Sequence, residues 1–372
     1  MSTNTTTQPL LAPIQMGDLL LSNRMAMAPL TRNRADNPDS APTDLHVEYY
    51  SQRAGAGLII SEGSQVSERG VGYIYTAGIH NAAQIEGWKK VTKAVHNKEG
   101  HIFCQLWHVG RISHPDFHNG ELPLAPSAIN PKAQAYTQNG FTDTVTPKAM
   151  STEEIKTAID EFRQGAANAI EAGFDGVEIH AANGYLVHQF IAKCANHRTD
   201  EYGGSIENRS RFLFELLEAV ATEIPLNRVG IRLNPMAHGF SGMSIDEETL
   251  PIFEYIVKKL GELTINGASL AYLHIMQPFG DVSEVSHAIT NVTQHFRPLF
   301  KGILMTNNGF NQASGNAIIA ENHADMVAYG KLFIANPDLP KRFEAHAELN
   351  RWDSKTFYTQ GKEGYTDYPF LK

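Results

Sequence analysis

Eight short runs of apolar and β-branched residues recur along the chain, and segments with the periodicity of helices separate them. The runs are Arg24–Leu30, Gly57–Glu62, Ile102–Trp107, Gly176–His180, Val229–Leu233, Leu270–Ile275, Ile303–Thr306 and Met326–Tyr329. The clearest helical patterns are Ala83–Asn97, Thr152–Ala172, Arg209–Glu223 and Glu247–Leu260. Eight strands that alternate with helices fit one (β/α)8 TIM barrel better than two doubly wound domains. We therefore predict an α/β fold in which residues 1–372 form a single barrel domain.

Three residues indicate where helices begin and end. Ser151 precedes Glu153-Glu154 and Asp246 precedes Glu247-Glu248, so each has the position of an N-cap before an acidic first turn. Gly173 follows the second helical pattern and is expected to end it.

The longest irregular segment, from about Ile112 to Ala149, follows the third strand and is rich in Pro, Asn, Thr and Gly. In a barrel it is a βα-loop insertion on the face that carries active sites. Loops of this length are usually lids or binding loops. We predict a lid-like insertion over residues 112–149.

Composition excludes several classes of partner. The net charge is −9 and no basic run is present, so nucleic acid is not an expected ligand. No apolar run reaches the roughly 20 residues that span a bilayer. The two cysteines form no disulfide framework, and Met1–Gln8 lacks the features of a signal peptide. We expect a cytoplasmic protein that is a monomer or a small homo-oligomer.

Polar residues gather at the end of the fourth predicted strand. The apolar run that contains Val177 and Ile179 ends in His180, followed closely by Asn183 and Tyr185. Burying three side chains that can donate a proton or a hydrogen bond in an apolar core would cost free energy. Since barrel enzymes place their chemistry at the carboxyl ends of strands, this cluster predicts a site.

Gln105 and Arg232 lie inside strands that are otherwise apolar. Burying such side chains costs free energy unless they are fully paired. Taken singly, each is as well explained as a paired structural residue. Because both belong to the same barrel rim, a polar ligand across the barrel mouth is the better explanation of the pair.

A phosphate site is predicted after the last two strands. Asn307-Asn308-Gly309 precedes a helical pattern and can offer backbone N–H groups, while Lys331 follows the eighth strand and adds a countercharge. An Asn-Gly turn with a surface lysine is the simpler alternative. A Rossmann dinucleotide site is disfavoured, because no G-x-G-x-x-G follows a strand.

Metal binding is a second explanation for a chain with sixteen histidines. Several fall near the predicted rim: His108, His114, His118, His180, His188 and His197. No H-x-H or H-E-x-x-H motif is present, and the first strand carries no metal-binding residue. We predict no metal, although a metal-dependent barrel hydrolase that uses these histidines stays an alternative.

Five motifs resemble the Old Yellow Enzyme family of flavin-dependent ene-reductases, above all its bacterial N-ethylmaleimide, pentaerythritol tetranitrate and 2-cyclohexenone reductases. The resemblance runs from about Leu11 to the C-terminus, and its most specific part is the block from His180 to Ser205. The motifs are Ala28-Pro-Leu-Thr-Arg32, Gln105-Leu-Trp-His108, His180-Ala-Ala-Asn-Gly-Tyr185, Arg198-Thr-Asp-Glu-Tyr-Gly-Gly-Ser205 with Glu207-Asn-Arg209, and Gly364-Tyr-Thr-Asp-Tyr-Pro369.

The resemblance implies non-covalent FMN on a (β/α)8 barrel. It also implies ping-pong reduction by NAD(P)H of electron-poor alkenes, such as α,β-unsaturated carbonyl or nitro compounds. It assigns the isoalloxazine contacts to Thr31 and Gln105 with the backbone near Pro29 and Gly63, and places Arg232 at the pyrimidine edge. The residues that it assigns to the phosphate end of FMN are Asn308, Gly309, Gly330 and Lys331.

For the substrate, the resemblance implies that His180 and Asn183 hold the carbonyl or nitro oxygen and that Tyr185 protonates the α-carbon. It makes Trp107, Tyr73 and Tyr358 the walls of the pocket. Without a Rossmann module, the nicotinamide has to stack on the flavin in the same pocket, which suits a ping-pong order. A flavin-binding protein without turnover is a third, non-catalytic alternative.

Three positions depart from the family pattern. Lys331 stands where the family usually has Arg, so the grip on the phosphate is expected to be weaker. The stretch from Ala192 to Asn196 replaces a turn that contains Ser-Pro in close relatives. Many relatives carry His in place of Asn183, and since both types can donate a hydrogen bond, the function is expected to survive.

Overall fold

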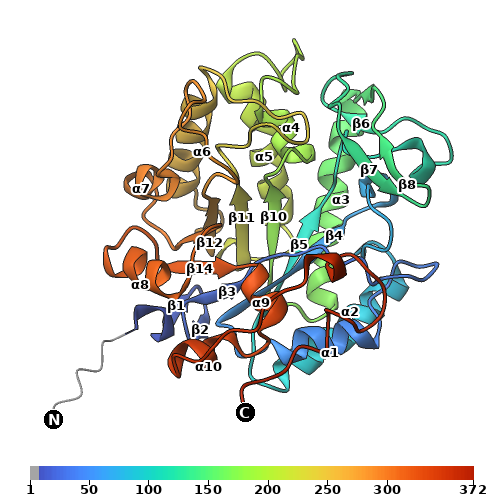
Figure 1. Ribbon diagram of the computed structural model, residues 1–372. Helices are drawn as coiled ribbons and strands as arrows, with labels where there is room; N and C mark the ends of the chain where they lie inside the picture. The colour runs from blue at the N-terminus through green and yellow to red at the C-terminus, as the bar shows by residue number, and fades with distance from the viewer. Residues whose placement is uncertain (1–7) are drawn as a thin grey trace.

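Eight parallel strands close into a barrel in the computed structural model, which describes residues 8–372. Most of the Met1–Gln8 segment therefore lies outside the described residues. Around the barrel the strands follow the order β10, β11, β12, β13, β14, β3, β4, β5 (Figure 1). Their bounds are β3 Met25–Met27, β4 Leu58–Gln65, β5 Ile102–Trp107, β10 Gly176–Ala181, β11 Val229–Leu233, β12 Tyr272–Met276, β13 Leu304–Asn307 and β14 Met326–Tyr329. The predicted barrel is confirmed, strand for strand.

Helices surround the barrel. They are α1 Asp44–Gln52, α2 Ala82–His96, α3 Thr152–Glu171, α4 Leu186–Ile191, α5 Ile206–Val220, α6 Thr249–Glu262, α7 Val292–Phe296, α8 Gln312–Ala320, α9 Lys331–Ala335 and α10 Leu339–Glu344. All four helices predicted from periodicity are present, with ends that differ by at most three residues. No helix within residues 8–372 has the length and apolar character needed to cross a membrane.

The predicted helix ends are correct for α3 and wrong for α6. Ser151 Oγ accepts a hydrogen bond from the backbone N–H of Glu154, which forms a capping box, and Gly173 follows the helix with φ of +85°. Helix α6 begins at Thr249 with Glu248 at its N-cap. Asp246 instead accepts hydrogen bonds from the backbone of Glu248 and the hydroxyl of Thr249, so it shapes the turn that leads into the helix.

A hairpin closes the amino-terminal end of the barrel. Its strands, β1 (Ile14–Met16) and β2 (Leu19–Leu21), pair antiparallel and lie at the lower left of Figure 1. Met16 and Leu21 pack in one apolar cluster with side chains from the barrel strands, among them Phe103 and Tyr272. Because this end is filled with apolar groups, a ligand can enter only from the opposite end, where the strands terminate.

The insertion after β5 is more ordered than the sequence predicts. It contains β6 (Leu124–Ala125) paired with β9 (Lys148–Ala149), and a hairpin of β7 (Gln134–Thr137) and β8 (Gly140–Asp143). The prediction of an irregular segment was therefore wrong for these stretches. In Figure 1 the insertion lies beside α3 at the carboxyl end of the strands. The backbone N–H of Ile74 donates to Tyr136 O at 3.0 Å, which ties the hairpin to the segment that carries Tyr73.

Candidate active site

Parallel pairing brings the polar strand residues into two layers at the open end of the barrel. In the lower layer, Glu178 on β10 pairs in register with Gln105 on β5. In the upper layer, His180 on β10 pairs in register with Arg232 on β11. Arg232 pairs in turn with His274 on β12. Side chains two residues apart share a face of a strand. The residues predicted on separate strands are therefore brought together in the barrel mouth.

One hydrogen bond fixes the orientation of the His180 ring and determines which ring nitrogen carries the proton. The backbone N–H of Ala182 donates to His180 Nδ1 at 3.3 Å. Burial, with smaller effects from Arg232, His188 and His274, holds the pKa of His180 well below its usual value. A neutral imidazole whose Nδ1 accepts must carry its proton on Nε2. His180 thus presents an Nε2–H donor at neutral pH.

Asn183 is held in the same manner. Its Oδ1 accepts a hydrogen bond of 3.0 Å from Asn234 Nδ2, which leaves the two N–H groups of Asn183 Nδ2 for another partner. The residue adopts φ of +58°, a left-handed conformation that Asn tolerates better than most residues, and Gly184 follows with φ of +81°. Asn183 therefore supplies a second oriented N–H donor, three residues after His180.

Tyr185 lies among aromatic rings at the N-cap of α4. Its hydroxyl is 3.2 Å from that of Tyr73, and its ring packs edge-on against His180 and Trp107 with centroid distances of 4.9 and 5.1 Å. Tyr73 and Trp107 stack at 5.6 Å. Burial, then Tyr73, raises the pKa of Tyr185 well above its usual value. The phenol therefore keeps its proton at neutral pH.

Arg232 supplies the strongest indication of a ligand. The residue is 6% exposed, and within residues 8–372 its Nε has no hydrogen-bond partner. Burial lowers the pKa of Arg232, and the charge of Glu178 opposes that shift. An unpaired buried donor is costly, so an acceptor that completes this site is expected. The electron-rich pyrimidine edge of FMN, which the sequence resemblance predicts here, would provide such an acceptor.

The predicted phosphate residues lie at the ends of β13 and β14. Asn308 and Gly309 adopt positive φ angles of +76° and +85°, and the space beside the Gly309 Cα is open. Asn308 Nδ2 donates to Gln277 O and Pro278 O, so its side chain is held by the loop that follows β12. Gly330 and Lys331 begin α9, and Lys331 Nζ lies 5.9 Å from the ring centroid of Trp352. The turn at Asn308 and Gly309 can bind a phosphate through its backbone N–H groups.

Residues from the first two strands line the other side of the mouth. Pro29 is buried and Thr31 is half-buried, directly after β3. Gly63 lies past a register shift in the β4–β5 pairing, and a Cβ on it would come within 2.8 Å of the Trp107 ring. Glycine is therefore required there for Trp107 to occupy its place. The contacts of Pro29, Thr31 and Gly63 with FMN stay predictions.

The C-terminal segment is held against the end of β3 by two arginines. Arg32 donates to Phe357 O and Gly364 O, and Arg34 donates to the carbonyl oxygens of Thr356 and Phe357. These bonds fix the segment that carries Tyr358, which is 56% exposed and close enough to affect the pKa of Tyr73 and Tyr185. Tyr358 is thus placed near the predicted pocket, at its solvent side.

The rim histidines bond locally. His188 Nδ1 accepts from the N–H of Gly184, His118 Nε2 lies 2.9 Å from Ser113 Oγ, and His114 pairs with Asp116. In the part of the chain that the structure describes, no group of three His, Cys, Asp or Glu side chains is placed to hold a metal. The geometry lends no support to the metal-dependent hydrolase.

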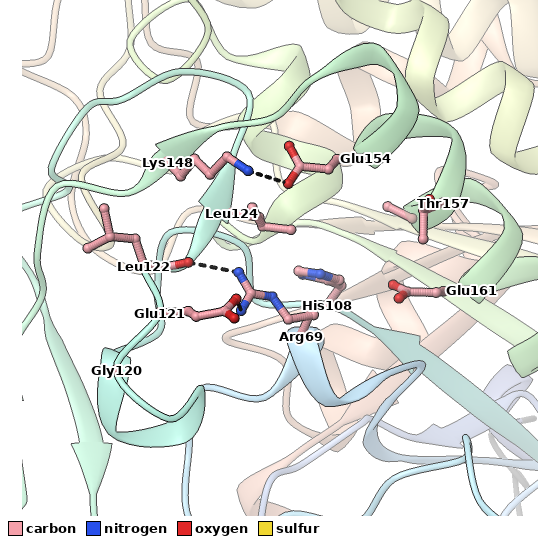
Figure 2. A pocket seen from close by; sticks show the side chains of 11 residues that line it. Arg69, His108, Gly120, Glu121, Leu122, Leu124, Lys148, Glu154, Thr157 and Glu161 are labelled. Carbon is pink, nitrogen blue, oxygen red and sulfur yellow. Dashed lines mark hydrogen bonds and ion pairs between the residues drawn. The ribbon is translucent and has the colours of Figure 1, made fainter.

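A separate cavity of about 620 Å³ lies between the insertion and α3 (Figure 2). Four of its five charged residues form ion pairs, Arg69 Nη1 with Glu121 at 2.8 Å and Lys148 with Glu154 at 2.7 Å, and Glu161 accepts a hydrogen bond from Ser67 Oγ at 2.7 Å. His108 lines this cavity, so it belongs here and not to the barrel mouth. The residues that converge at the mouth do not line this cavity as the structure describes it.

Sequence reasoning gave no role to the side chains of four polar residues of the site, Glu178, Asn234, His274 and Asn307. Glu178 accepts from Gln105 Nε2 at 2.7 Å and contacts His274 Nδ1 at 2.8 Å. Asn234 holds Asn183, and Asn307 is buried at the end of β13. The period of two along a strand could have found Glu178, since it lies two residues before His180 on the same face.

The geometry and the comparisons agree on one class. The mouth of the (β/α)8 barrel holds a buried arginine whose Nε donor is free among the described residues, two oriented donors and a turn with backbone N–H groups, which is compatible with a bound flavin. Residues 9–350 match the model of the NADH:flavin oxidoreductase / NADH oxidase family. The chain therefore belongs to this family, as an Old Yellow Enzyme homologue with FMN as its cofactor.

The relatives match over nearly the whole chain. 12-Oxophytodienoate reductase 1 of Oryza sativa subsp. japonica is 44% identical over 369 residues, which cover 98% of this chain and 93% of that protein. The structure of morphinone reductase superposes with a TM-score of 0.90 at 44% identity, covering 99% of this chain and 98% of the other. An old yellow enzyme homologue from Zymomonas mobilis gives a TM-score of 0.91 at 39% identity, covering 97% and 99%.

Proposed function

We propose that the protein is an FMN-dependent NAD(P)H:alkene oxidoreductase that reduces the C=C bond of α,β-unsaturated carbonyl or nitro compounds by a ping-pong mechanism. The observation that carries this proposal is the pair of oriented donors, His180 Nε2–H and Asn183 Nδ2–H, each fixed through its other polar atom. Such a pair matches the oxygen of an electron-poor alkene. Relatives that are reductases of 12-oxophytodienoate and morphinone support a reductase.

The residues of the mouth divide between cofactor and substrate. We assign the phosphate end of FMN to Asn308, Gly309, Gly330 and Lys331. The ring contacts are assigned to Thr31, Gln105 and Arg232 with the backbone near Pro29 and Gly63. When bound, FMN supplies the hydride that it has received from NAD(P)H.

The two donors act on the oxygen of the substrate. When a conjugated alkene takes up hydride at its β-carbon, negative charge builds on the carbonyl or nitro oxygen. Donors that are already oriented stabilise this charge more in the transition state than in the ground state. The hydrogen bonds from Ala182 and Asn234 keep both donors in place, so little reorganisation is needed.

Tyr185 completes the reaction by donating its phenolic proton to the α-carbon. Its hydroxyl is held by Tyr73 at 3.2 Å, and its raised pKa keeps the proton available at neutral pH. The proton is replaced from solvent after each turnover. Tyr73, Trp107 and Tyr358 enclose the alkene, and the insertion over residues 112–149 is proposed to act as a lid.

NAD(P)H is proposed to bind in the same pocket before the alkene. Two structures of morphinone reductase contain tetrahydroNAD, which supports nicotinamide binding in this fold. One pocket that serves both molecules in turn produces ping-pong kinetics.

The two free cysteines, Cys104 and Cys194, support a reducing and hence cytoplasmic setting.

Turnover on a panel of compounds tests this function. The protein is incubated with NAD(P)H and 2-cyclohexenone, N-ethylmaleimide or a nitroalkene, and the products are identified by mass spectrometry. We expect products that have gained two hydrogens at the C=C bond. Oxidation of NAD(P)H without a saturated product would favour a flavin-binding protein that lacks this activity.

The pH dependence of alkene reduction is expected to be flat from about pH 6 to about pH 9. The depressed pKa of His180 keeps its ring neutral throughout this range, and the raised pKa of Tyr185 keeps its phenol protonated. Neither group therefore gains or loses a proton there. The measurement is the rate of the alkene step in stopped-flow experiments at each pH. A limb near the unperturbed histidine pKa of about 6.5 would contradict the assignment.

A further inference from the structure

Glu178 lies in the same layer of the barrel as Gln105 and one layer below Arg232, two of the residues assigned to FMN. It is fully buried on β10, and its two carboxylate oxygens each have a partner. Oε1 accepts from Gln105 Nε2 at 2.7 Å, and Oε2 accepts from His274 Nδ1 at 2.8 Å. Burying a carboxylate costs free energy of desolvation, and these two hydrogen bonds offset part of that cost.

Two of the ligand-facing residues depend on this carboxylate. Gln105 can rotate its amide by half a turn, and the bond from its Nε2 to Glu178 selects one orientation, with Oε1 directed away from the carboxylate. Arg232 lies one layer above Glu178 and on the neighbouring strand. The charge of Glu178 acts on Arg232 although the two do not form a direct ion pair among the described residues.

We propose that Glu178 is a positioning residue that orients the Gln105 amide toward FMN and, through its charge, lowers the reduction potential of the bound flavin. The proposal rests on Gln105 and Arg232 facing FMN, as assigned above. Electron uptake adds negative charge to the site, and Arg232 favours it. A buried carboxylate beside Arg232 opposes it, because Coulomb interactions are strong where water is excluded.

Two substitutions separate charge from position. Glu178→Gln keeps the length of the side chain and an acceptor oxygen but removes the charge. Glu178→Asp keeps the charge but shortens the side chain, so that the bonds of 2.7 and 2.8 Å cannot both be kept. Glu178→Met is a second uncharged variant, used if Glu178→Gln does not accumulate as folded protein.

The measurement is the midpoint potential of the FMN-loaded protein, determined by anaerobic spectroelectrochemistry without any alkene. In Glu178→Gln we expect the two-electron equilibrium to shift at least tenfold toward reduction, a rise of about 30 mV. In Glu178→Asp we expect a change of less than twofold, about 9 mV. The Asp variant should also be purified with less FMN per protein, since the Gln105 amide is no longer held.

Two results would overturn the proposal. One is a potential in the uncharged variants within twofold of the wild type, because the flavin then does not sense the carboxylate. The other is an equal rise in Glu178→Asp, because geometry and not charge is then the cause. Failure to reduce any alkene would refute the proposed function but would leave these potentials measurable, so the two failures are distinguishable.

Discussion

Replacing Tyr185 by Phe is expected to slow alkene reduction about a hundredfold or more, within the range of general acid catalysis. Only the hydroxyl is lost, and the edge-on contacts of the ring with His180 and Trp107 remain. The reduction of the flavin by NAD(P)H requires no proton from Tyr185 and should keep nearly its full rate. Stopped-flow measurement of each half-reaction separates the two steps.

The matched control is Tyr73→Phe. This variant removes the hydroxyl 3.2 Å from that of Tyr185 but leaves the proposed acid in place. It should lower the alkene rate much less than the Tyr185 substitution. If Tyr185→Phe damages both half-reactions equally, Tyr185 has a structural role and the proton comes from elsewhere.

Replacing Asn183 by Gly is expected to lower the alkene rate about 10²- to 10³-fold, as the loss of one oxyanion donor does in other enzymes. Glycine is chosen because φ at this position is +58°, where an alanine would add backbone strain to the loss of the side chain. The rate of hydride transfer from saturating NAD(P)H should fall less, since no comparable charge develops on an oxygen in that step.

Asn183→His serves as the control for this prediction. Histidine tolerates a left-handed conformation better than most residues and can donate a hydrogen bond. This variant should keep most of the activity. Should Asn183→Gly instead retain the wild-type alkene rate, the oxygen is held by other residues and the proposed clamp is wrong.

The order and number of barrel strands could be predicted from the sequence because each strand is a short apolar run. The ends were harder to place. The first strand was predicted as Arg24–Leu30 and spans Met25–Met27, since Pro29 has no N–H to continue a ladder. The second strand extends past the predicted Glu62 to Gln65 through a register shift that no local pattern announces.

The hairpin in the insertion was missed although its turn is visible in the sequence. Asn139-Gly140 is a strong hairpin signal, and Gly140 adopts φ of +88°. The strands β7 and β8 around it have four residues each, and β8 exposes Phe141 as well as the polar Asp143, so no regular alternation of apolar and polar residues marks them as strands. Pairing in this hairpin comes from the turn and from the contact with the Tyr73 segment, not from an apolar pattern.

The candidate site could be predicted by residue type but not by geometry. That His180, Asn183 and Tyr185 belong together follows from their spacing. Which nitrogen of His180 carries the proton depends on a backbone N–H, and the orientation of Asn183 depends on Asn234, which is 51 residues away. Likewise, the bond between Arg32 and Gly364 joins residues 332 positions apart. Contacts at such separations follow from barrel closure.

An anaerobic titration tests the central claim most directly, that one pocket reduces FMN with a nicotinamide and then passes the hydride to an alkene. The purified protein should be yellow, bleach with about one equivalent of NADH or NADPH, and regain its colour with one equivalent of 2-cyclohexenone. The enone should be recovered as the saturated ketone. Protein that stays colourless after addition of FMN, or that bleaches but does not recolour with any electron-poor alkene, would contradict the account.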